Sequence, residues 1–530
     1  MKYSPHIVIA LLAILVSACA QVVAPTGGTR DTQPPQVKEV KPKNESLNFN
    51  REQTISITFD EFVKLENIND KLIISPPLEH DIKTKLRGKN LEIKFEDTLK
   101  ENTTYVMNFN ESIVDLTENN PLDFTYVFST GNEIDSFVVS GRLVNAFDLK
   151  VVKDAWVALY NDLKSDSLPM KKMPTYIDKT NEEGSFEITN VKAGKYKLLA
   201  IADENKNFLF DKPTEKIAFK NEFIEVSENS INDSLKLFLF EEDKQKLFVE
   251  EKKEDGPHFF IKLSRTIDSV SYNFIDTTQS EVLLLSQVSK ENDSLHFWMK
   301  NIQFDNYRLV VESADFSDTI KFDTDTLTKK NKLKLTNPLP SIQPYYQSIK
   351  LEFNRPIKSF DASKVKLLNT DSVTLDFKIE QSKRKAILHI KASLQQDSSY
   401  HLIIADSAFT DIYGFANDSI GKSFSVDAED DYSTLEVEVV NEFDFPQFVQ
   451  LLDGQEKVIQ EHKVDSGKLT FNHLKSGKYN LKLIIDRNGN GKWDTGDYIR
   501  NLQPESVWMY EETIDLRPNW DQEIKWIIAN

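Results

Sequence analysis

Short segments in which hydrophobic and polar residues alternate make up most of the chain after residue 50. Clear examples are residues 54–59, 91–95, 105–109 and 124–128. A period of two places one face of each segment in a core and the other in water, as in antiparallel strands. Such segments recur roughly every 10–15 residues, with Asn, Asp, Gly or Pro between them. The sequence therefore predicts an all-β protein of tandem β-sandwiches.

The N-terminus has the pattern of an export signal. Met1 and Lys2 lead into the apolar run 7–16, which is too short to cross a bilayer of ~30 Å. The run ends in Val-Ser-Ala-Cys at Cys19, the only cysteine of the chain. This end resembles the lipobox of bacterial lipoproteins of the Bacteroidetes type. The alternative is an ordinary signal peptide with an incidental cysteine.

The lipobox resemblance implies a signal peptide at 1–18, lipidation of Cys19, and a lipidated tether at 19–33. Two or three acyl chains anchor a protein stably, so we expect attachment to the outer membrane. Acidic residues do not follow Cys19 directly. In the Bacteroidetes-type lipoproteins that this chain resembles, an acidic run at this place often marks export to the cell surface. The resemblance therefore implies the periplasmic face rather than the cell surface.

Residues 34–131 resemble the S-layer-type (SbsA-like) bacterial Ig-like domain. The resemblance rests on motifs in residues 34–37, 57–63, 99–105, 113–116 and 126–131. Part of this unit returns in residues 338–430, where 349–357 is similar to 55–63, and Asp411-Ile412 is similar to Asp115-Leu116. We expect a second, divergent Ig-like domain there.

Residues 137–240 resemble the carboxypeptidase-regulatory or Cna-B-type β-sandwich, a module without peptidase chemistry. Seven of its residues return 283 positions later. The first set is Gly184, Gly194, Tyr196, Asp203, Asn205, Asn207 and Asp211; the second is Gly467, Gly477, Tyr479, Asp486, Asn488, Asn490 and Asp494. One constant offset predicts a duplicated B-like domain at 433–530. Residues 241–337 are predicted to form a middle β module that resembles no family.

Residues 486–497 have the ligand spacing of a calcium loop. The oxygen-bearing side chains are those of Asp486, Asn488, Asn490, Asp494 and Asp497. Gly491 permits the sharp bend, and Lys492 would contribute its backbone carbonyl. The alternative is a hairpin turn whose Asp and Asn side chains bind their own backbone.

The first copy of this loop is a weaker calcium candidate. It keeps Asp203, Asn205, Asn207 and Asp211, but Phe208 and Thr214 replace the glycine and the last carboxylate. The plain turn is favoured here.

The negative net charge and the lack of catalytic sequence motifs disfavour several classes of function. Asp and Glu number 84 against 65 Lys and Arg, a net charge of −19, which disfavours nucleic acid as a partner. The chain has no HExxH pair, nucleophile elbow or phosphate loop. We therefore predict no catalytic residue and no enzyme activity. Four aromatic residues near the C-terminus are interpreted as core rather than as a ligand platform: Trp508, Tyr510, Trp520 and Trp526.

Together these features predict a non-enzymatic outer-membrane lipoprotein. The resemblances imply that it is all-β, with tandem Ig-like and prealbumin-like β-sandwich domains after a lipoprotein signal peptide. It would act as a multidomain scaffold, or as a protein-binding accessory subunit of a cell-envelope complex with a partner such as a β-barrel outer-membrane protein. It would require no cofactor, with Ca²⁺ as the one candidate ion. The alternative is a polysaccharide-binding surface lipoprotein of a nutrient-uptake system.

Overall fold

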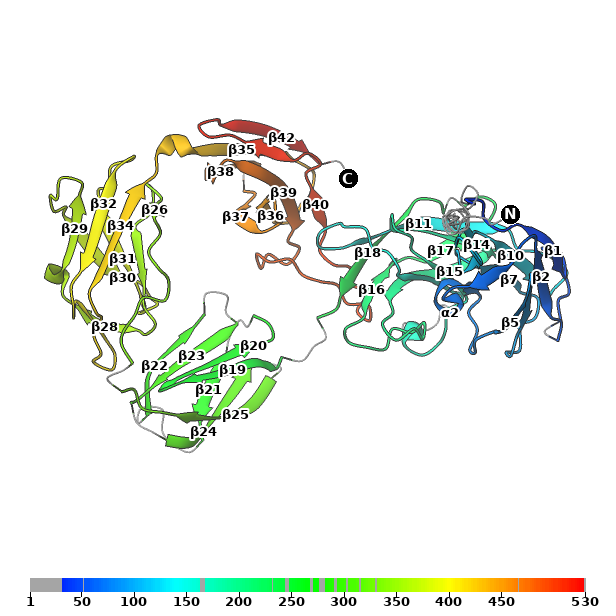
Figure 1. The fold of residues 1–530 in the computed structure, drawn as a ribbon, viewed down its shortest axis with the longest axis horizontal. Helices are drawn as coiled ribbons and strands as arrows, with labels where there is room; N and C mark the ends of the chain where they lie inside the picture. The colour runs from blue at the N-terminus through cyan, green and yellow to red at the C-terminus, as the bar shows by residue number, and fades with distance from the viewer. Residues whose placement is uncertain are drawn as a thin grey trace, which may run out of the picture. The chain divides into compact units, whose positions relative to one another are not determined.

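The structure is a computed structural model that describes most of residues 31–528. The residues left out within this range are 51, 163–166, 231, 244–246, 267–269, 276–281, 290–292, 302–303, 314–315, 329–330 and 466. The predicted signal peptide, Cys19 and most of the tether lie outside the described residues. The single α-helix of the described residues is α2 (Ile68–Lys71), and strands dominate elsewhere. The prediction of an all-β chain of tandem sandwiches is confirmed (Figure 1). Within the described part, no helix is long and apolar enough to cross a membrane.

The chain divides into two compact units, and each is described by itself. The first contains Met1–Asn145, Lys150–Glu241 and Tyr498–Asn501. The second contains Ala146–Leu149, Glu242–Asp497 and Leu502–Asn530.

The first Ig-like domain is a sandwich of two main sheets. One sheet has the order β1-β2-β6-β5 and the other β10-β7-β4, with a small third sheet β3-β8-β9. The bounds are β1 (Val37–Lys41), β2 (Ile55–Phe59), β3 (Val63–Leu65), β4 (Ile73–Ser75), β5 (Lys83–Arg87), β6 (Asn90–Lys94), β7 (Thr104–Asn108), β8 (Ile113–Asp115), β9 (Pro121–Leu122) and β10 (Thr125–Ser129). The inward faces of both main sheets meet in one core around Phe59, Tyr105 and Phe128, because alternate residues of each strand point inward.

The first B-like domain is built on one long sheet. Its order is β13-β12-β15-β16-β18-β11-β14, and β17 also pairs with β15. The bounds are β11 (Phe137–Asn145), β12 (Trp156–Tyr160), β13 (Tyr176–Lys179), β14 (Ser185–Val191), β15 (Gly194–Ala202), β16 (Lys216–Phe219), β17 (Ile224–Val226) and β18 (Leu235–Glu241). β11 runs parallel to β18, and Gly141 is paired with Leu235. A Cβ atom at Gly141 would lie 2.1 Å from the Leu235 carbonyl oxygen, so the strand approach requires glycine.

The middle module, in the second unit, has sheets β19-β20-β23-β22 and β21-β24-β25. The bounds are β19 (Val249–Asp255), β20 (His258–Leu263), β21 (Ser271–Phe274), β22 (Leu283–Val288), β23 (Ser294–Met299), β24 (Phe304–Ser313) and β25 (Phe316–Thr324). Phe259 and Phe322 stack between the sheets with ring centroids 3.8 Å apart. This segment, predicted from strand patterns alone, thus has its own core.

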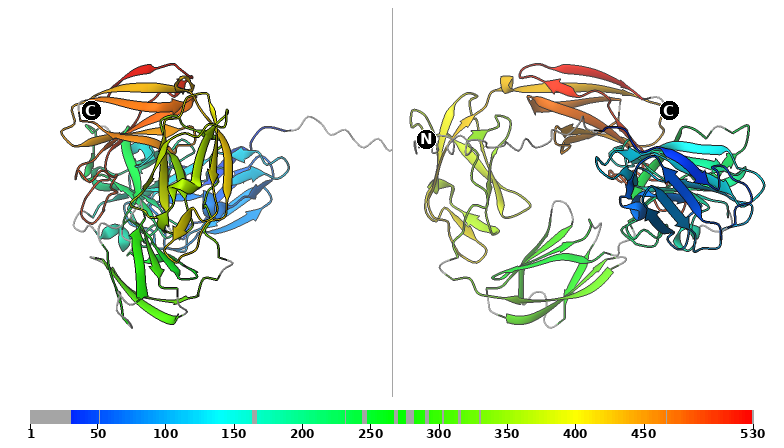
Figure 2. Two further views of the ribbon diagram at one scale, coloured as in Figure 1. Left: turned by 90° about the vertical axis from the view of Figure 1, so that its left-hand side faces the viewer. Right: turned by 45° about the vertical axis from the view of Figure 1, so that its right-hand side comes forward.

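The second Ig-like domain, drawn in yellow-green to yellow in Figure 2, also has two main sheets and one small sheet. Its sheets are β26-β34-β32-β29, β27-β31-β30 and β28-β33. The bounds are β26 (Ile342–Gln343), β27 (Ile349–Glu352), β28 (Ile357–Phe360), β29 (Val365–Asn369), β30 (Phe377–Gln381), β31 (Ile387–Ala392), β32 (Ser399–Ile404), β33 (Phe409–Asp411) and β34 (Ile420–Val426). Ile357 pairs with Asp411 as Val63 pairs with Asp115. The two domains therefore share the register of this strand pair.

The second B-like domain has sheets β38-β35-β42 and β37-β36-β39-β40, with β41 paired to β39. The bounds are β35 (Tyr432–Val440), β36 (Gln447–Asp453), β37 (Val458–Lys463), β38 (Lys468–Lys475), β39 (Gly477–Ile485), β40 (Val507–Met509), β41 (Ile514–Leu516) and β42 (Gln522–Ile527). The Tyr479 hydroxyl donates to the Lys475 carbonyl oxygen at 2.8 Å, as Tyr196 does to Lys192 in the first copy.

The aromatic residues near the C-terminus do not all belong to the core. Trp526 is buried, and Trp508 and Tyr510 pack against the same cluster. Trp520 is 59% exposed, so its assignment to the core was wrong. It lies in the turn between β41 and β42, where the Arg517 guanidinium lies 5.4 Å from its ring centroid.

Candidate functional site

The loop that follows β39 is organised by Asp486. Its side chain is buried at the end of the strand, and both carboxylate oxygens face back into the loop. One accepts the Asn490 N–H at 3.0 Å and the other the Gly491 N–H at 2.7 Å. Gly491 has φ +75°, a conformation that favours glycine. The aspartate therefore holds the bend that the spacing predicted.

Asp494 closes the loop from the opposite side. One of its oxygens accepts the side-chain N–H groups of Asn488 at 2.6 Å and Asn490 at 2.8 Å. The Asn490 side-chain oxygen accepts the Lys492 N–H at 2.8 Å. Asp497 lies further along, where its backbone pairs in both directions with Leu502. The structure thus gathers the other five predicted residues in one hydrogen-bonded turn.

The sequence analysis missed a buried glutamate that clamps this loop. Glu505 is 5% exposed, and its carboxylate accepts the N–H of Arg487 at 2.6 Å and of Asp494 at 3.0 Å. Its backbone carbonyl accepts the Trp493 indole N–H at 2.9 Å. Burial raises the pKa of Glu505, while the two N–H donors act in the opposite direction.

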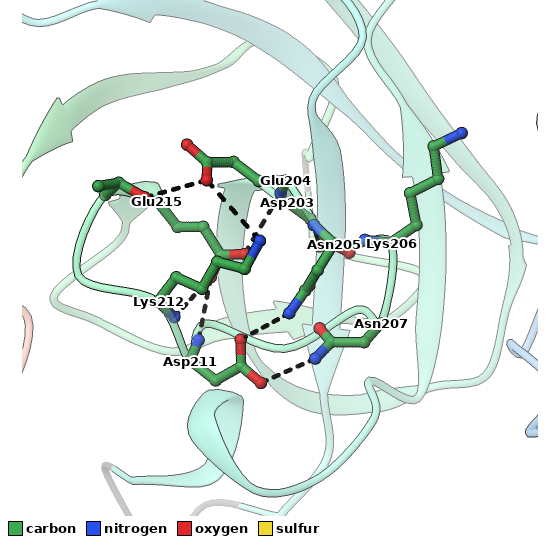
Figure 3. Close-up of polar contacts among 9 residues, drawn as sticks. Asp203, Glu204, Asn205, Lys206, Asn207, Asp211, Lys212 and Glu215 are labelled. Carbon is green, nitrogen blue, oxygen red and sulfur yellow. Dashed lines mark hydrogen bonds and ion pairs between the residues drawn. The ribbon is translucent and has the colours of Figure 1, made fainter.

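The first loop is built in the same way (Figure 3). Asp203 accepts the N–H groups of Asn205, Lys206 and Phe208. Asp211 accepts the side-chain N–H groups of Asn205 at 3.1 Å and Asn207 at 2.8 Å (Figure 3).

A buried glutamate also clamps this first loop. Glu215, 1% exposed, accepts the N–H groups of Glu204, Asp211 and Lys212. It follows Asp211 by four residues, whereas Glu505 follows Asp494 by eleven. Because of this difference in length, Glu215 and Glu505 do not share the constant offset of the other matched residues, and the sequence analysis did not pair them.

Calcium binding by either loop stays a prediction. Among the described residues, no group of three or more His, Cys, Asp or Glu side chains is arranged to hold a metal ion. In the second loop, the side-chain nitrogens of Asn488 and Asn490 face Asp494, so both amides would have to turn to offer oxygen ligands.

Calorimetric titration of the full chain with calcium tests this prediction. We expect one weak site, with Kd about 10⁻⁴ to 10⁻³ M, which Asp494→Asn abolishes. Asp211→Asn in the first loop is the matched control and should leave the heat unchanged. Equal heats for the wild type and Asp494→Asn would contradict a site in the second loop.

Replacing Glu505 with alanine should lower the stability of the second B-like domain by about 2–4 kcal/mol. Two backbone N–H groups lose their acceptor, and each buried unpaired group costs ~1–3 kcal/mol. Scanning calorimetry of the full chain measures the effect as a shift of one transition. The exposed Glu511→Ala is the control, with an expected change within about 0.5 kcal/mol. Equal shifts for the two variants would contradict the clamp.

A buried lysine lies on the same strand as this loop. Lys482 in β39 is 3% exposed, and its Nζ lies 3.0 Å from the centroid of the Phe147 ring, which belongs to the same unit. Burial lowers the pKa of Lys482 to about 8. The ammonium is therefore destabilised in the folded state at neutral pH.

Lys482→Met should raise stability by about 1–2 kcal/mol at pH 7, since ~1.4 kcal/mol per pKa unit is only partly offset by the lost cation–π contact. The folded lysine releases its proton near pH 8, while the unfolded one keeps it to about pH 10.4. Wild-type stability therefore rises across this window, and the advantage of the variant should shrink. Scanning calorimetry at pH 7 and 10 measures it against the exposed Lys478→Met. A gain that is equal at both pH values would contradict the assignment.

The known proteins that resemble this chain are only distantly similar to it. No curated protein sequence matches the chain. Among solved structures, the major pilin subunit BcpA of Bacillus cereus is 12% identical over 74% of this chain and 99% of its own, with a TM-score of 0.14. The Bacillus anthracis TIE protein is 11% identical over 100% and 80%, with a TM-score of 0.14. Domains 1–6 of surface layer protein SbsC are 10% identical over 92% and 68%, also at 0.14. Likenesses at these scores say nothing about function.

The family comparison agrees with the first domain of the structure. Residues 31–130 match the model of the bacterial Ig-like domain. The matched segment contains the whole sandwich from β1 to β10 and its shared core. Residues 31–130 are therefore similar to the bacterial Ig-like domain, and they fold as a β-sandwich.

Proposed function

We propose that this chain is a non-enzymatic lipoprotein of a Gram-negative cell envelope, most closely of the Bacteroidetes type. It acts as a scaffold or protein-binding accessory subunit at the periplasmic face of the outer membrane, where Cys19 carries the lipid anchor. The tandem β-sandwich architecture carries the proposal. Each of the five groups of strands has its own buried core in the described residues. Such domains serve as stiff spacers and display surfaces rather than as catalytic centres.

The edge strand β42 is the surface that we propose for a protein partner. Among the described strands it pairs only with β35, so its other edge offers backbone N–H and C=O groups. Ile527 is 68% exposed, and its register neighbour Val440 is 38% exposed. An edge with exposed apolar side chains suits a partner that adds a strand of its own.

Co-purification from mildly solubilised envelopes tests this function. The tagged, lipidated chain should bring down a stoichiometric envelope protein, such as an outer-membrane β-barrel, identified by mass spectrometry. Cys19→Ala should release the chain from the membrane fraction. Recovery of the protein alone would overturn the accessory role.

Two substitutions in β42 test the edge separately. Ile527→Asp should lose the partner because it places a charge in an apolar contact. Lys525→Gln, two residues earlier and also exposed, is the matched control and should retain it. A partner retained by Ile527→Asp would overturn the role of the edge without affecting the accessory function.

A further inference from the structure

The second unit contains a cleft that the scaffold role does not use. It has a volume of about 530 Å³, within the range of small-molecule sites. One wall comes from β22 and β23 of the middle module and the other from β27 and the β30–β31 turn of the second Ig-like domain. The Gln287 side chain donates to the Lys383 carbonyl oxygen at 3.1 Å across the same junction.

Two residues that line the cleft carry buried hydrogen-bond donors without partners. These atoms are the indole Nε1 of Trp298 and the guanidinium Nη2 of Arg384, neither of which has an acceptor among the described residues. Trp298 is 6% exposed, so water reaches it poorly. A buried donor without a partner is energetically costly, and native proteins contain few of them. Both donors belong to residues that line the same cleft.

A smaller cavity of about 180 Å³ continues the cleft. The two cavities share His258 and Asn354. A third unpartnered buried group, the hydroxyl of Tyr413, belongs to this cavity. Burial raises the pKa of Tyr413, which keeps the hydroxyl protonated and able to donate. Residues with unpartnered buried donors therefore line both cavities.

The positive charge of the cleft comes from Arg384. His258, His296 and Trp298 form a stack, with the His258 ring 4.8 Å from Trp298 and its Nε2 3.1 Å from His296 Nδ1. Burial lowers the pKa of His258 to about 4 and also lowers that of His296. Both imidazoles are thus neutral at pH 7. A guanidinium with an unpaired N–H recognises a carboxylate well.

The wall that holds Arg384 also carries hydrogen-bond acceptors. Glu352 and Asn354 both line the cleft from the second Ig-like domain. A simple anion would gain nothing from these oxygens, and the Glu352 carboxylate would repel it. A ligand with hydroxyl groups would donate to them while its carboxylate binds Arg384.

We propose that this cleft binds a sugar acid, with the carboxylate on Arg384 and the Trp298 N–H, and hydroxyl groups on Glu352 and Asn354. The site adds a ligand to the proposed scaffold and does not depend on it. A volume of 530 Å³ has room for one or two sugar rings.

Calorimetry of the full chain in mild detergent tests the proposal, with digalacturonate as the probe. We expect binding that Arg384→Met weakens about 10–100-fold, because it removes a charge-assisted hydrogen bond. Trp298→Phe, which keeps a ring and removes the N–H, should weaken it about 3–10-fold. The exposed neighbour Lys383→Met should bind like the wild type.

Three results would overturn the proposal. They are no binding of digalacturonate by the wild type, unchanged affinity in Arg384→Met, and equal affinity for the neutral galactose disaccharide. Tighter binding of a glutamate-rich peptide than of digalacturonate would reject the sugar acid in favour of an acidic protein segment. Scanning calorimetry of each variant shows whether the second unit stays folded. Arg384→Met and Trp298→Phe are independent, so one folded variant is sufficient for the test.

Discussion

Replacing Arg355 with methionine should destabilise the second Ig-like domain by about 3–5 kcal/mol, because it breaks a buried ion pair from one side. The Arg355 Nε donates to an Asp411 oxygen at 2.6 Å, and their side chains are 9% and 0% exposed. Nη2 donates to the Asn331 carbonyl oxygen at 2.9 Å. Without the guanidinium, the carboxylate stays buried with only its two N–H donors, from Tyr413 and Phe415.

Scanning calorimetry of the full chain should show this loss as a downward shift of one transition. Lys358→Met, on the exposed side of β28, is the matched control and should change stability by no more than about 0.5 kcal/mol. The double variant Arg355→Met, Asp411→Asn should recover part of the loss, since no buried charge then remains. A loss below about 1 kcal/mol in the single variant would contradict the buried pair.

In the first Ig-like domain, the corresponding buried aspartate carboxylate is stabilised without an arginine. Asp115 occupies the register position of Asp411, and four backbone N–H groups of residues 117–120 donate to its carboxylate. Glu61 lies where the second domain has Arg355, two residues before the strand residue that pairs with the aspartate. Burial, with the nearby Asp115 carboxylate, raises the pKa of Glu61. The turn that the two domains share therefore tolerates opposite charges at a neighbouring position.

The structural features that were predicted from the sequence depend on local residue patterns. Alternation predicted the strands because each side chain's face depends only on its place in the strand. The constant spacing of Asp203 to Asp211 and Asp486 to Asp494 predicted that the two loops are copies, and both fold as closed Asx turns.

The features that were not predicted from the sequence depend on contacts between residues that are distant or unequally spaced in the chain. Glu505 was missed because the extra length of the second loop breaks the spacing to Glu215. The Arg355–Asp411 pair joins residues 56 positions apart. The unpartnered donors of Trp298 and Arg384 become visible only when two modules meet. Exposure of Trp520 follows from its place in a turn, which alternation does not describe.

Replacing Gly141 with alanine should destabilise the first B-like domain by about 3 kcal/mol or more, at or above the usual range for overpacking. The added Cβ would lie 2.1 Å from the Leu235 carbonyl oxygen and 2.8 Å from the Phe186 ring. Gly141 pairs with both residues, on the parallel side with Leu235 and on the antiparallel side with Phe186. The backbone of Leu235 cannot rotate away from the added Cβ as a flexible side chain can. β18 therefore has to move away from β11, which weakens their pairing.

A second glycine separates this clash from the general effect of glycine in strands. Gly421 in β34 is exposed, and a Cβ there would meet only the His401 ring at 3.8 Å. Gly421→Ala should therefore stabilise its domain by roughly 0.5–1 kcal/mol, because alanine loses less backbone entropy on folding. Scanning calorimetry of the full chain compares the two variants. Stability changes of opposite sign in the two variants would show that the close approach of β11 and β18 requires glycine at position 141. A loss of less than about 1 kcal/mol for Gly141→Ala would mean that the parallel pairing has room for a side chain.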